Sequence, residues 1–315
     1  MNIFTAINNA NKILKKNGVK NPQLDCELLM SKAIDSNKKD ILINLDKKLS
    51  QENFDYFNDL ITHRSKGKPI AYLINKKEFW KYEFYVSEDV LIPRPDTEII
   101  VEQALTLTKH KSKLNILDIG VGSGCILLSI LKERKNFYGT GIDVSKDSLK
   151  ICKINSNKLG VFNRLKLIKS DIDNFDYGKY DLIISNPPYI KNVDLKYLDK
   201  NVVGFEPKLA LDGGLDGISV IRKVINKLDL RYLENDVLDF EPKLALDGGF
   251  DGLSVIRKVI NKSSELIKLN GKFFLEIAFD QKNKVIGLLK NKGFYINKIL
   301  KDYSKNDRCI ICTKI

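Results

Sequence analysis

The apolar positions of the chain follow two different periods, and the change between them divides it into parts. Up to about residue 75 they recur every three or four residues, as on one face of an amphipathic helix. Residues 78–92 instead mix aromatic and β-branched residues in partial alternation, which is typical of a β-hairpin. The pattern therefore predicts a small helical-bundle domain over residues 1–75 and a β-hairpin linker over residues 76–96.

After residue 96, helical stretches alternate with short apolar runs. A helix is expected over residues 97–109, with Asp96 as its N-cap. The runs that predict strands lie at residues 114–119, 137–142, 165–168, 180–185, 272–278, 294–300 and 308–313. Such alternation favours a mostly parallel sheet with helices on both faces, so we predict an α/β, Rossmann-like domain over residues 97–315. A turn-like segment joins the last two runs, which could form an antiparallel pair.

A direct tandem repeat interrupts this rhythm. Residues 193–227 and 228–262 are identical at 26 of 35 positions. Two copies are too few for a solenoid, which needs about three units to bury a continuous core. We therefore interpret the repeat as a segmental duplication inside an ordinary domain, with one copy docked in the fold and the other protruding.

Length and composition agree with two globular domains. A chain of 315 residues with 43% apolar residues can bury two cores, and no segment approaches the roughly 18 uninterrupted apolar residues of a membrane span. The first ten residues have neither the basic start nor the apolar centre of a secretion signal. We therefore expect a soluble, cytoplasmic protein with no membrane partner.

The net charge of +13 identifies no partner by itself. The lysines are spread along the whole chain, a bias that genome base composition produces as readily as a polyanionic partner does. Direct nucleic-acid binding is not what this pattern favours, although the charge does not exclude it.

The five cysteines are scattered, which does not resemble a disulfide framework. Cys309 and Cys312 have the spacing of half a zinc site, but no second pair of Cys or His lies nearby in sequence. A buried C-terminal strand is the simpler interpretation, and we expect no metal.

A glycine-rich turn follows the first predicted strand of the α/β domain and opens a helix. Its residues are Gly120, Val121, Gly122, Ser123 and Gly124. Glycines let the backbone approach a ligand without a Cβ clash. Asp143 ends the next strand, where a carboxylate can accept both ribose hydroxyls of a nucleoside. Such turns serve NAD, FAD or S-adenosylmethionine, and a tight turn without a ligand is the alternative.

Asp171 and Ile172 follow the third strand at the same predicted edge. The Asp171 carboxylate could accept from an adenine amino group while the amide of Ile172 donates to the ring. Capping or turn formation by the aspartate is the competing interpretation.

The most informative element is Asn186-Pro187-Pro188-Tyr189, after the fourth strand. An amide nitrogen is a poor nucleophile, so it must be held with its lone pair aimed at an electrophilic methyl group. The Asn186 oxygen and the Pro187 carbonyl can accept its two hydrogens while Tyr189 stacks on the planar group. Prolines stiffen the loop because they fix φ and remove a donor. The combination predicts an S-adenosylmethionine-dependent methyltransferase of class I fold that acts on an amide or amine nitrogen.

At this point the chain resembles the release factor glutamine methyltransferases (PrmC, also called HemK). The resemblance covers nearly the whole chain and includes the segments at residues 67–73, 91–98, 186–190 and 306–308, together with the Phe-Glu-Pro segment present in each copy of the repeat. It implies N5-methylation of the glutamine in the Gly-Gly-Gln motif of peptide chain release factors, and therefore a role in translation termination. It also implies that residues 1–75 bind the release factor.

The resemblance also assigns residues. The glycine turn with Asp143, Asp171, Ile172 and Asn186 would bind the cofactor, and the Asn-Pro-Pro-Tyr loop would bind the glutamine. Arg94 and Thr97-Glu98 would shape the wall of the site, although Arg94 could equally serve in a structural pair.

The duplication is the departure from the family, in which one such segment joins the loop to the next strand. We favour docking of the second copy, because residues 228–262 continue directly into the following helix and strand. Two alternatives stay open: a nucleic-acid adenine or cytosine amino-methyltransferase, which uses the same loop, and a cofactor-binding protein inactivated by the duplicated segment.

Overall fold

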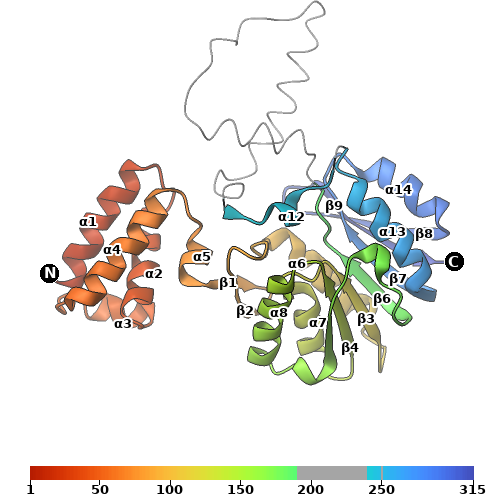
Figure 1. Ribbon diagram of the computed structural model, residues 1–315, viewed down its shortest axis with the longest axis horizontal. Helices are drawn as coiled ribbons and strands as arrows, with labels where there is room; N and C mark the ends of the chain where they lie inside the picture. Colours follow the sequence, from red (N-terminus) through yellow and green to blue (C-terminus); the bar gives the residue numbers. More distant parts are fainter. Residues whose placement is uncertain (190–239, 250) are drawn as a thin grey trace, which may run out of the picture. The chain divides into compact units, whose positions relative to one another are not determined.

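The computed structural model describes residues 1–189, 240–249 and 251–315 (Figure 1). The described chain divides into two compact units, one containing Met1–Lys76 and the other beginning at Lys77. None of the described helices combines the length and the apolar character needed to cross a membrane.

The first unit is a helical bundle. Its helices are α1 (Ile3–Lys16), α2 (Pro22–Ala33), α3 (Lys38–Ile43), α4 (Gln51–Ser65) and α5 (Ile70–Ile74). Asn2 and Ser50 cap α1 and α4 by accepting backbone N–H groups. Apolar faces of the helices enclose a core that includes Leu14, Leu29 and Phe57, all fully buried.

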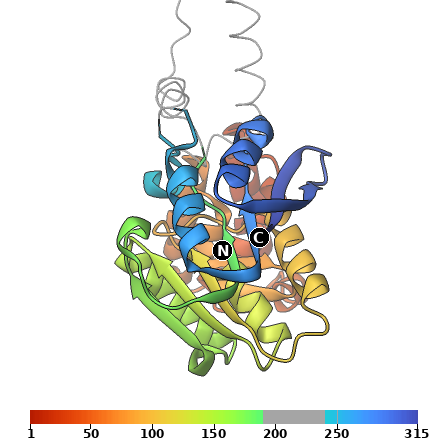
Figure 2. The ribbon, with the colours of Figure 1, turned by 90° about the vertical axis from the view of Figure 1, so that its right-hand side faces the viewer.

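The second unit is built on a seven-stranded sheet of order β5-β4-β3-β6-β7-β9-β8. Its strands are β3 (Asn115–Ile119), β4 (Tyr138–Asp143), β5 (Leu165–Lys169), β6 (Tyr180–Ser185), β7 (Ile267–Glu276), β8 (Phe294–Lys301) and β9 (Asp307–Lys314). β3 to β7 are parallel, whereas β9 runs antiparallel to both β7 and β8. The β8–β9 hairpin lies at one edge, in dark blue in Figure 2. The predicted fold class and the final antiparallel pair are confirmed.

Helices cover both faces of this sheet. One group is α6 (Glu98–Leu107), α7 (Cys125–Glu133) and α8 (Lys146–Lys158), and the other is α13 (Ser254–Leu266) and α14 (Lys282–Asn291). Neighbouring strand residues serve opposite cores: Ile116 packs with the first group and Leu117 with the second. Short helices complete the unit: η1 (Pro95–Thr97), η2 (Phe162–Arg164), η3 (Ile172–Asn174) and α12 (Lys243–Leu246).

Two local predictions are wrong in detail. Asp96 is not an N-cap, because it lies inside η1 and α6 begins only at Glu98. The hairpin is shorter than expected, with β1 (Lys76–Phe79) and β2 (Tyr82–Tyr85). Side chains of α8 hold the backbone at and after the end of β2: the Asn155 amide bonds to both backbone groups of Tyr85, and the Ser148 hydroxyl donates to the Asp89 carbonyl at 3.0 Å.

The cysteine pair at the C-terminus occupies the buried strand that the sequence predicted. Cys309 and Cys312 are fully buried in β9. Burial raises the pKa of the Cys312 thiol, which keeps it protonated.

The first copy of the repeat lies outside the described residues. The described part of the second copy from residue 241 onward belongs to the sheet unit, where Ile256, Val259 and Ile260 of α13 pack into the core. α13 runs without a break from the second copy to Leu266, as the preference for that copy requires.

Candidate functional site

A cavity of about 510 Å³ opens at the carboxyl ends of β3, β4, β5 and β6. Ligands of doubly wound sheets bind at this edge, and the volume is within the range of small-molecule sites. The structure brings most of the predicted site residues together in its lining: Gly120, Val121, Gly122, Ser123, Asp143, Asp171, Ile172, Asn186, Pro187 and Pro188. Gly124 and Tyr189 are predicted site residues that do not line it.

The glycine turn connects β3 to α7 with three left-handed glycines, Gly120, Gly122 and Gly124. These φ values favour glycine over any other residue. Gly124 serves packing, because a Cβ there would lie 2.7 Å from the Cys152 sulfur. The first part of the turn therefore faces the cavity, whereas its last glycine lets α7 approach α8.

Asp143 ends β4 and is fixed by the turn that it faces. Its two carboxylate oxygens accept the N–H groups of Gly122 at 3.0 Å and Ser145 at 2.9 Å. Each carboxylate oxygen has about two acceptor sites, so each can still accept one hydroxyl from a ligand. Burial raises the Asp143 pKa, and the backbone hydrogen bonds oppose that rise.

Asp118 is a lining residue that sequence reasoning did not select. It is buried in β3, and burial followed by the nearby Asp143 carboxylate raises its pKa to about 7. The available signal was an acidic residue inside an apolar strand, next to the glycine turn. Six acidic residues line the cavity in all, and their carboxyl groups favour a ligand that carries positive charge.

Asp171 satisfies both interpretations of its sequence position. One carboxylate oxygen caps η3 by accepting the Asp173 N–H at 2.9 Å, and the residue also lines the cavity beside Ile172. Capping therefore orients the carboxylate at the cavity without occupying all of its acceptor sites.

The Asn-Pro-Pro-Tyr loop leaves the sheet at Ser185, whose hydroxyl donates to the Ile119 carbonyl at 2.8 Å. Its far end is held by contacts to the backbone of Tyr189. The Gln281 side chain donates to the Tyr189 carbonyl at 3.2 Å, and a Cβ on Gly248 would come within 2.7 Å of the Tyr189 Cα. The loop is therefore fixed at both ends.

Buried charged side chains lie around the Tyr189 ring. Arg308 is paired with Asp302 at 2.8 Å, and Thr97 donates to the Glu276 carboxylate at 2.9 Å. Burial raises the pKa of Glu276 to about 7, against the opposing effect of Arg308. Burial also raises the Tyr189 pKa, with Glu276 adding to the rise. Tyr189 packs partly buried against the core, which explains why its ring does not line the cavity.

Arg94 and Thr97 line the cavity as expected, but Glu98 does not. The Glu98 carboxylate instead accepts the backbone N–H of Trp80 at 2.8 Å. Arg94 also forms an ion pair at 2.6 Å with Glu241, whose side chain is fully buried. Arg94 thus serves the cavity wall and a structural pair together.

The second copy of the repeat supplies part of the cavity wall, which sequence reasoning did not foresee. Its lining residues are Pro242, Ala245, Asp247, Ser254, Val255, Lys258 and Val259. Their only signal in sequence was the Phe-Glu-Pro segment, which ends at Pro242. The duplicated segment therefore contributes residues to the wall of the cavity.

Comparisons with known proteins agree with this geometry. Two family models match: the PrmC N-terminal domain over residues 5–74 and the methyltransferase small domain over residues 97–204. The release factor glutamine methyltransferase of Buchnera aphidicola subsp. Acyrthosiphon pisum is 34% identical over 302 residues, which cover 96% of this chain and 95% of that protein. This chain belongs to the release factor glutamine methyltransferase family. The resemblance drawn from its motifs is confirmed.

Other relatives also match most of this chain, although the share of their own length that is covered differs. The enzyme of Fusobacterium nucleatum is 33% identical, with 98% of this chain and 77% of that protein covered. The bifunctional methyltransferase of Rickettsia prowazekii is 31% identical over 96% of this chain, but the chain spans only 56% of its length. Among solved structures, the catalytic domain of hMettl16, crystallised with an RNA hairpin, has a TM-score of 0.51 at 14% identity and covers 74% of this chain and 75% of that one. That likeness concerns the fold alone.

Proposed function

We propose that this chain methylates the side-chain amide nitrogen (N5) of the glutamine in the Gly-Gly-Gln motif of peptide chain release factors, with S-adenosyl-L-methionine as methyl donor. Residues 1–75 would bind the release factor, residues 76–96 would link the domains, and residues 97–315 would catalyse the reaction in the cytoplasm. The observation that supports this proposal most directly is that the glycine turn and Asn186-Pro187-Pro188 line the same cavity in a member of this family.

The cavity residues fit this cofactor. Asp143 keeps acceptor capacity for two ribose hydroxyls, and Asp171 with Ile172 can meet an adenine edge. Asp118 is a further carboxyl group in the lining, which suits the ammonium and sulfonium charges of the ligand. When bound, S-adenosylmethionine supplies the electrophilic methyl group.

The Asn-Pro-Pro-Tyr loop would position the substrate amide. Asn186 and the Pro187 carbonyl accept its hydrogens, so that the nitrogen lone pair faces the methyl group. Because both ends of the loop are held, at Ser185 and at Tyr189, the loop backbone would need little rearrangement when the substrate binds. Positioning of this kind can contribute about 7–11 kcal/mol for well-oriented reactants. We assign Tyr189 a supporting role, in which it orients the loop from the core side.

Mass spectrometry of a release factor that has never been methylated tests the proposal. Incubation with this protein and S-adenosylmethionine should add one methyl group to the Gly-Gly-Gln peptide. A release factor with that glutamine changed to alanine is the matched control and should gain none. Labelling of DNA or RNA, with no label on the release factor, would instead support the nucleic-acid amino-methyltransferase.

We also propose that the second copy of the repeat occupies the position of the single family segment. The Arg94–Glu241 pair, the close approach of Gly248 to Tyr189 and the unbroken α13 support this assignment. Deletion of residues 193–227 should then preserve or raise turnover, whereas deletion of residues 228–262 should abolish it. The reverse result would assign the docked position to the first copy, and loss of turnover only in the full-length chain would show that the extra copy inhibits.

A further inference from the structure

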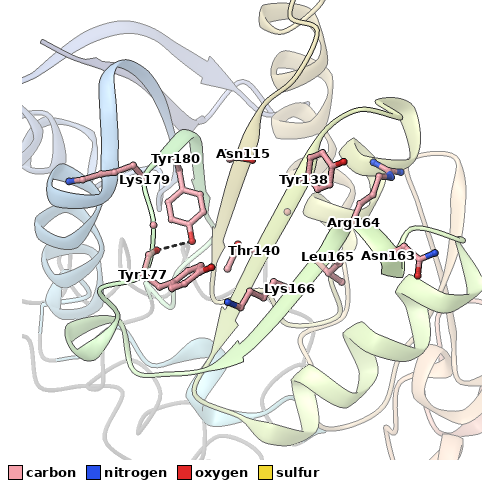
Figure 3. Close-up of a pocket in the computed structure, with 12 residues that line it drawn as sticks. Asn115, Tyr138, Thr140, Asn163, Arg164, Leu165, Lys166, Tyr177, Lys179 and Tyr180 are labelled. Atoms are coloured by element: carbon pink, nitrogen blue, oxygen red, sulfur yellow. Dashed lines mark hydrogen bonds between the residues drawn. The ribbon is translucent and has the colours of Figure 1, made fainter.

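A second cavity, of about 440 Å³, lies at the opposite edge of the sheet (Figure 3). It is formed where the parallel strands begin, at Asn115 of β3, Tyr138 of β4, Leu165 of β5 and Tyr180 of β6. None of the residues assigned to methyl transfer lines it. We call it the amino-edge pocket.

The charge of the amino-edge pocket has one sign. Its lining includes Arg164, Lys166 and Lys179, and none of its described lining residues is acidic. Arg164 is fixed by donating to the carbonyls of Phe137 at 2.8 Å and Leu131 at 2.7 Å, while Lys179 donates to the Glu265 carbonyl. The fold therefore holds positive charge beside the pocket, which favours anions.

Two lysine–tyrosine pairs accompany this charge. Tyr138 is 45% exposed with the Lys113 ammonium 5.1 Å from its ring centre, and Tyr177 is 55% exposed with the Lys166 ammonium at 3.6 Å. Tyr138 and Tyr177 lie on opposite sides of the pocket, with Thr140 between them (Figure 3). Buried Tyr180 donates to the Tyr177 carbonyl at 2.9 Å and fixes that segment. Each pair presents a planar ring and a cation on a flexible stem.

We propose that the amino-edge pocket binds a nucleotide unit of single-stranded RNA. A base stacks on Tyr138 or Tyr177, and the lysine that lies over that ring turns to the adjoining phosphate. An exposed cation–π contact is weak, and a stacked base with a phosphate–ammonium contact replaces it with two stronger interactions. Rings that stack any base give affinity with little sequence preference. The inference is independent of the proposed methyl transfer, because no residue is shared.

Fluorescence anisotropy with a fluorescein-labelled, mixed-sequence RNA of ten nucleotides tests the aromatic part. The double variant Tyr138→Ala/Tyr177→Ala of the full chain should bind about tenfold or more weakly. The matched control is Tyr295→Ala/Tyr303→Ala, which removes two tyrosines that are 60% and 83% exposed elsewhere on the same unit. Equal affinity of both double variants and the unaltered chain would overturn the proposal, as would absence of RNA binding by the unaltered chain.

The charge is tested by Lys113→Gln/Lys166→Gln against Lys284→Gln/Lys290→Gln, which removes the same charge from the exposed surface of α14. The first pair should lower the slope of log Kd against the logarithm of salt concentration by about 0.7 if one lysine contacts phosphate and by about 1.4 if both do, since each single-strand phosphate contact contributes roughly 0.7. Equal effects of the two lysine pairs would show only diffuse attraction and reject the pocket.

Competition with AMP and UMP distinguishes RNA from a free nucleotide as the ligand. If either mononucleotide displaces the RNA at a concentration near the Kd of that mononucleotide, the natural ligand is a free nucleotide. If inorganic polyphosphate displaces the RNA equally well from the unaltered chain and from both double tyrosine variants, base stacking is excluded.

Discussion

The two ends of the parallel strands differ in the charge and the exposure of the side chains that line their cavities. At the carboxyl edge, buried acids stand beside a glycine turn and a double-proline loop, and burial raises the pKa values of Asp118 and Glu276 to about 7. At the amino edge, exposed tyrosines alternate with lysines, and no acidic side chain is among the described residues that line the pocket.

Strand direction explains part of this difference. Each parallel strand enters a loop at its carboxyl end, and those loops lead into helix N-termini, which favour anionic ligand groups and capping acids. The opposite edge receives helix C-termini, whose free carbonyls favour cations. Arg164 shows this directly, because it donates to the Leu131 carbonyl in the last turn of α7. The same topology therefore places helix N-termini with their capping acids at the carboxyl edge and cations, held by helix carbonyls, at the amino edge.

The largest expected difference between the edges comes from two asparagine substitutions. Asn186→Ala should lower kcat for the release factor about 10²–10³-fold, the usual cost of removing one preorganised group at the reacting centre, while S-adenosylmethionine still binds. Asn163→Ala, an exposed substitution at the amino-edge pocket, should leave kcat unchanged. Calorimetry gives the binding and labelled methyl transfer gives kcat; unchanged turnover in Asn186→Ala with intact binding would remove the assignment of the loop.

The buried acids should make stability fall as pH rises. A carboxyl group whose folded pKa is raised binds more protons in the folded state, so its effect on stability is unfavourable above its unfolded pKa. For Glu276 the free energy of unfolding should decrease between about pH 4.5 and pH 7, by on the order of 3 kcal/mol at most. Glu276→Gln should flatten this slope in urea unfolding at a series of pH values. Exposed Glu102→Gln is the control and should preserve it.

A pair of glycine substitutions compares the copies of the repeat at the carboxyl edge. Gly248→Ala places a Cβ within 2.7 Å of the Tyr189 backbone, so the loop must shift, and a displacement of that kind should lower kcat about 10–100-fold. Gly213→Ala changes the equivalent glycine of the first copy and should leave kcat unaltered. A larger loss in Gly213→Ala would mean that the first copy contacts the loop.

The smallest expected effect belongs to Arg164 at the amino edge. Arg164→Gln removes charged hydrogen bonds to the last turn of α7 and should lower the free energy of unfolding by about 1–2 kcal/mol. Methyl transfer by the folded variant should be unchanged, because the cavity at the other edge is intact. Thermal unfolding measures the first effect; a parallel loss of kcat would show that the two edges are coupled.

The sequence by itself determined the α/β alternation, the glycine turn, the double-proline loop and the family, because each depends on residues that are neighbours in the chain. Hydrophobic period and backbone restrictions at glycine and proline are local properties. Asp143 could be located for the same reason, as the acid that ends an apolar strand.

Only the tertiary structure decided which distant groups meet. Thr97 bonds to Glu276, which is 179 residues away in the sequence, and Arg94 bonds to Glu241, which is 147 residues away. No local pattern encodes such contacts. The raised pKa values follow from burial, which depends on packing from several elements at once. The strand order likewise brings Tyr138 and Tyr177 to one pocket, since β4 and β6 both flank β3. Chemistry read from one segment was therefore predictable, and chemistry assembled across the sheet required the fold.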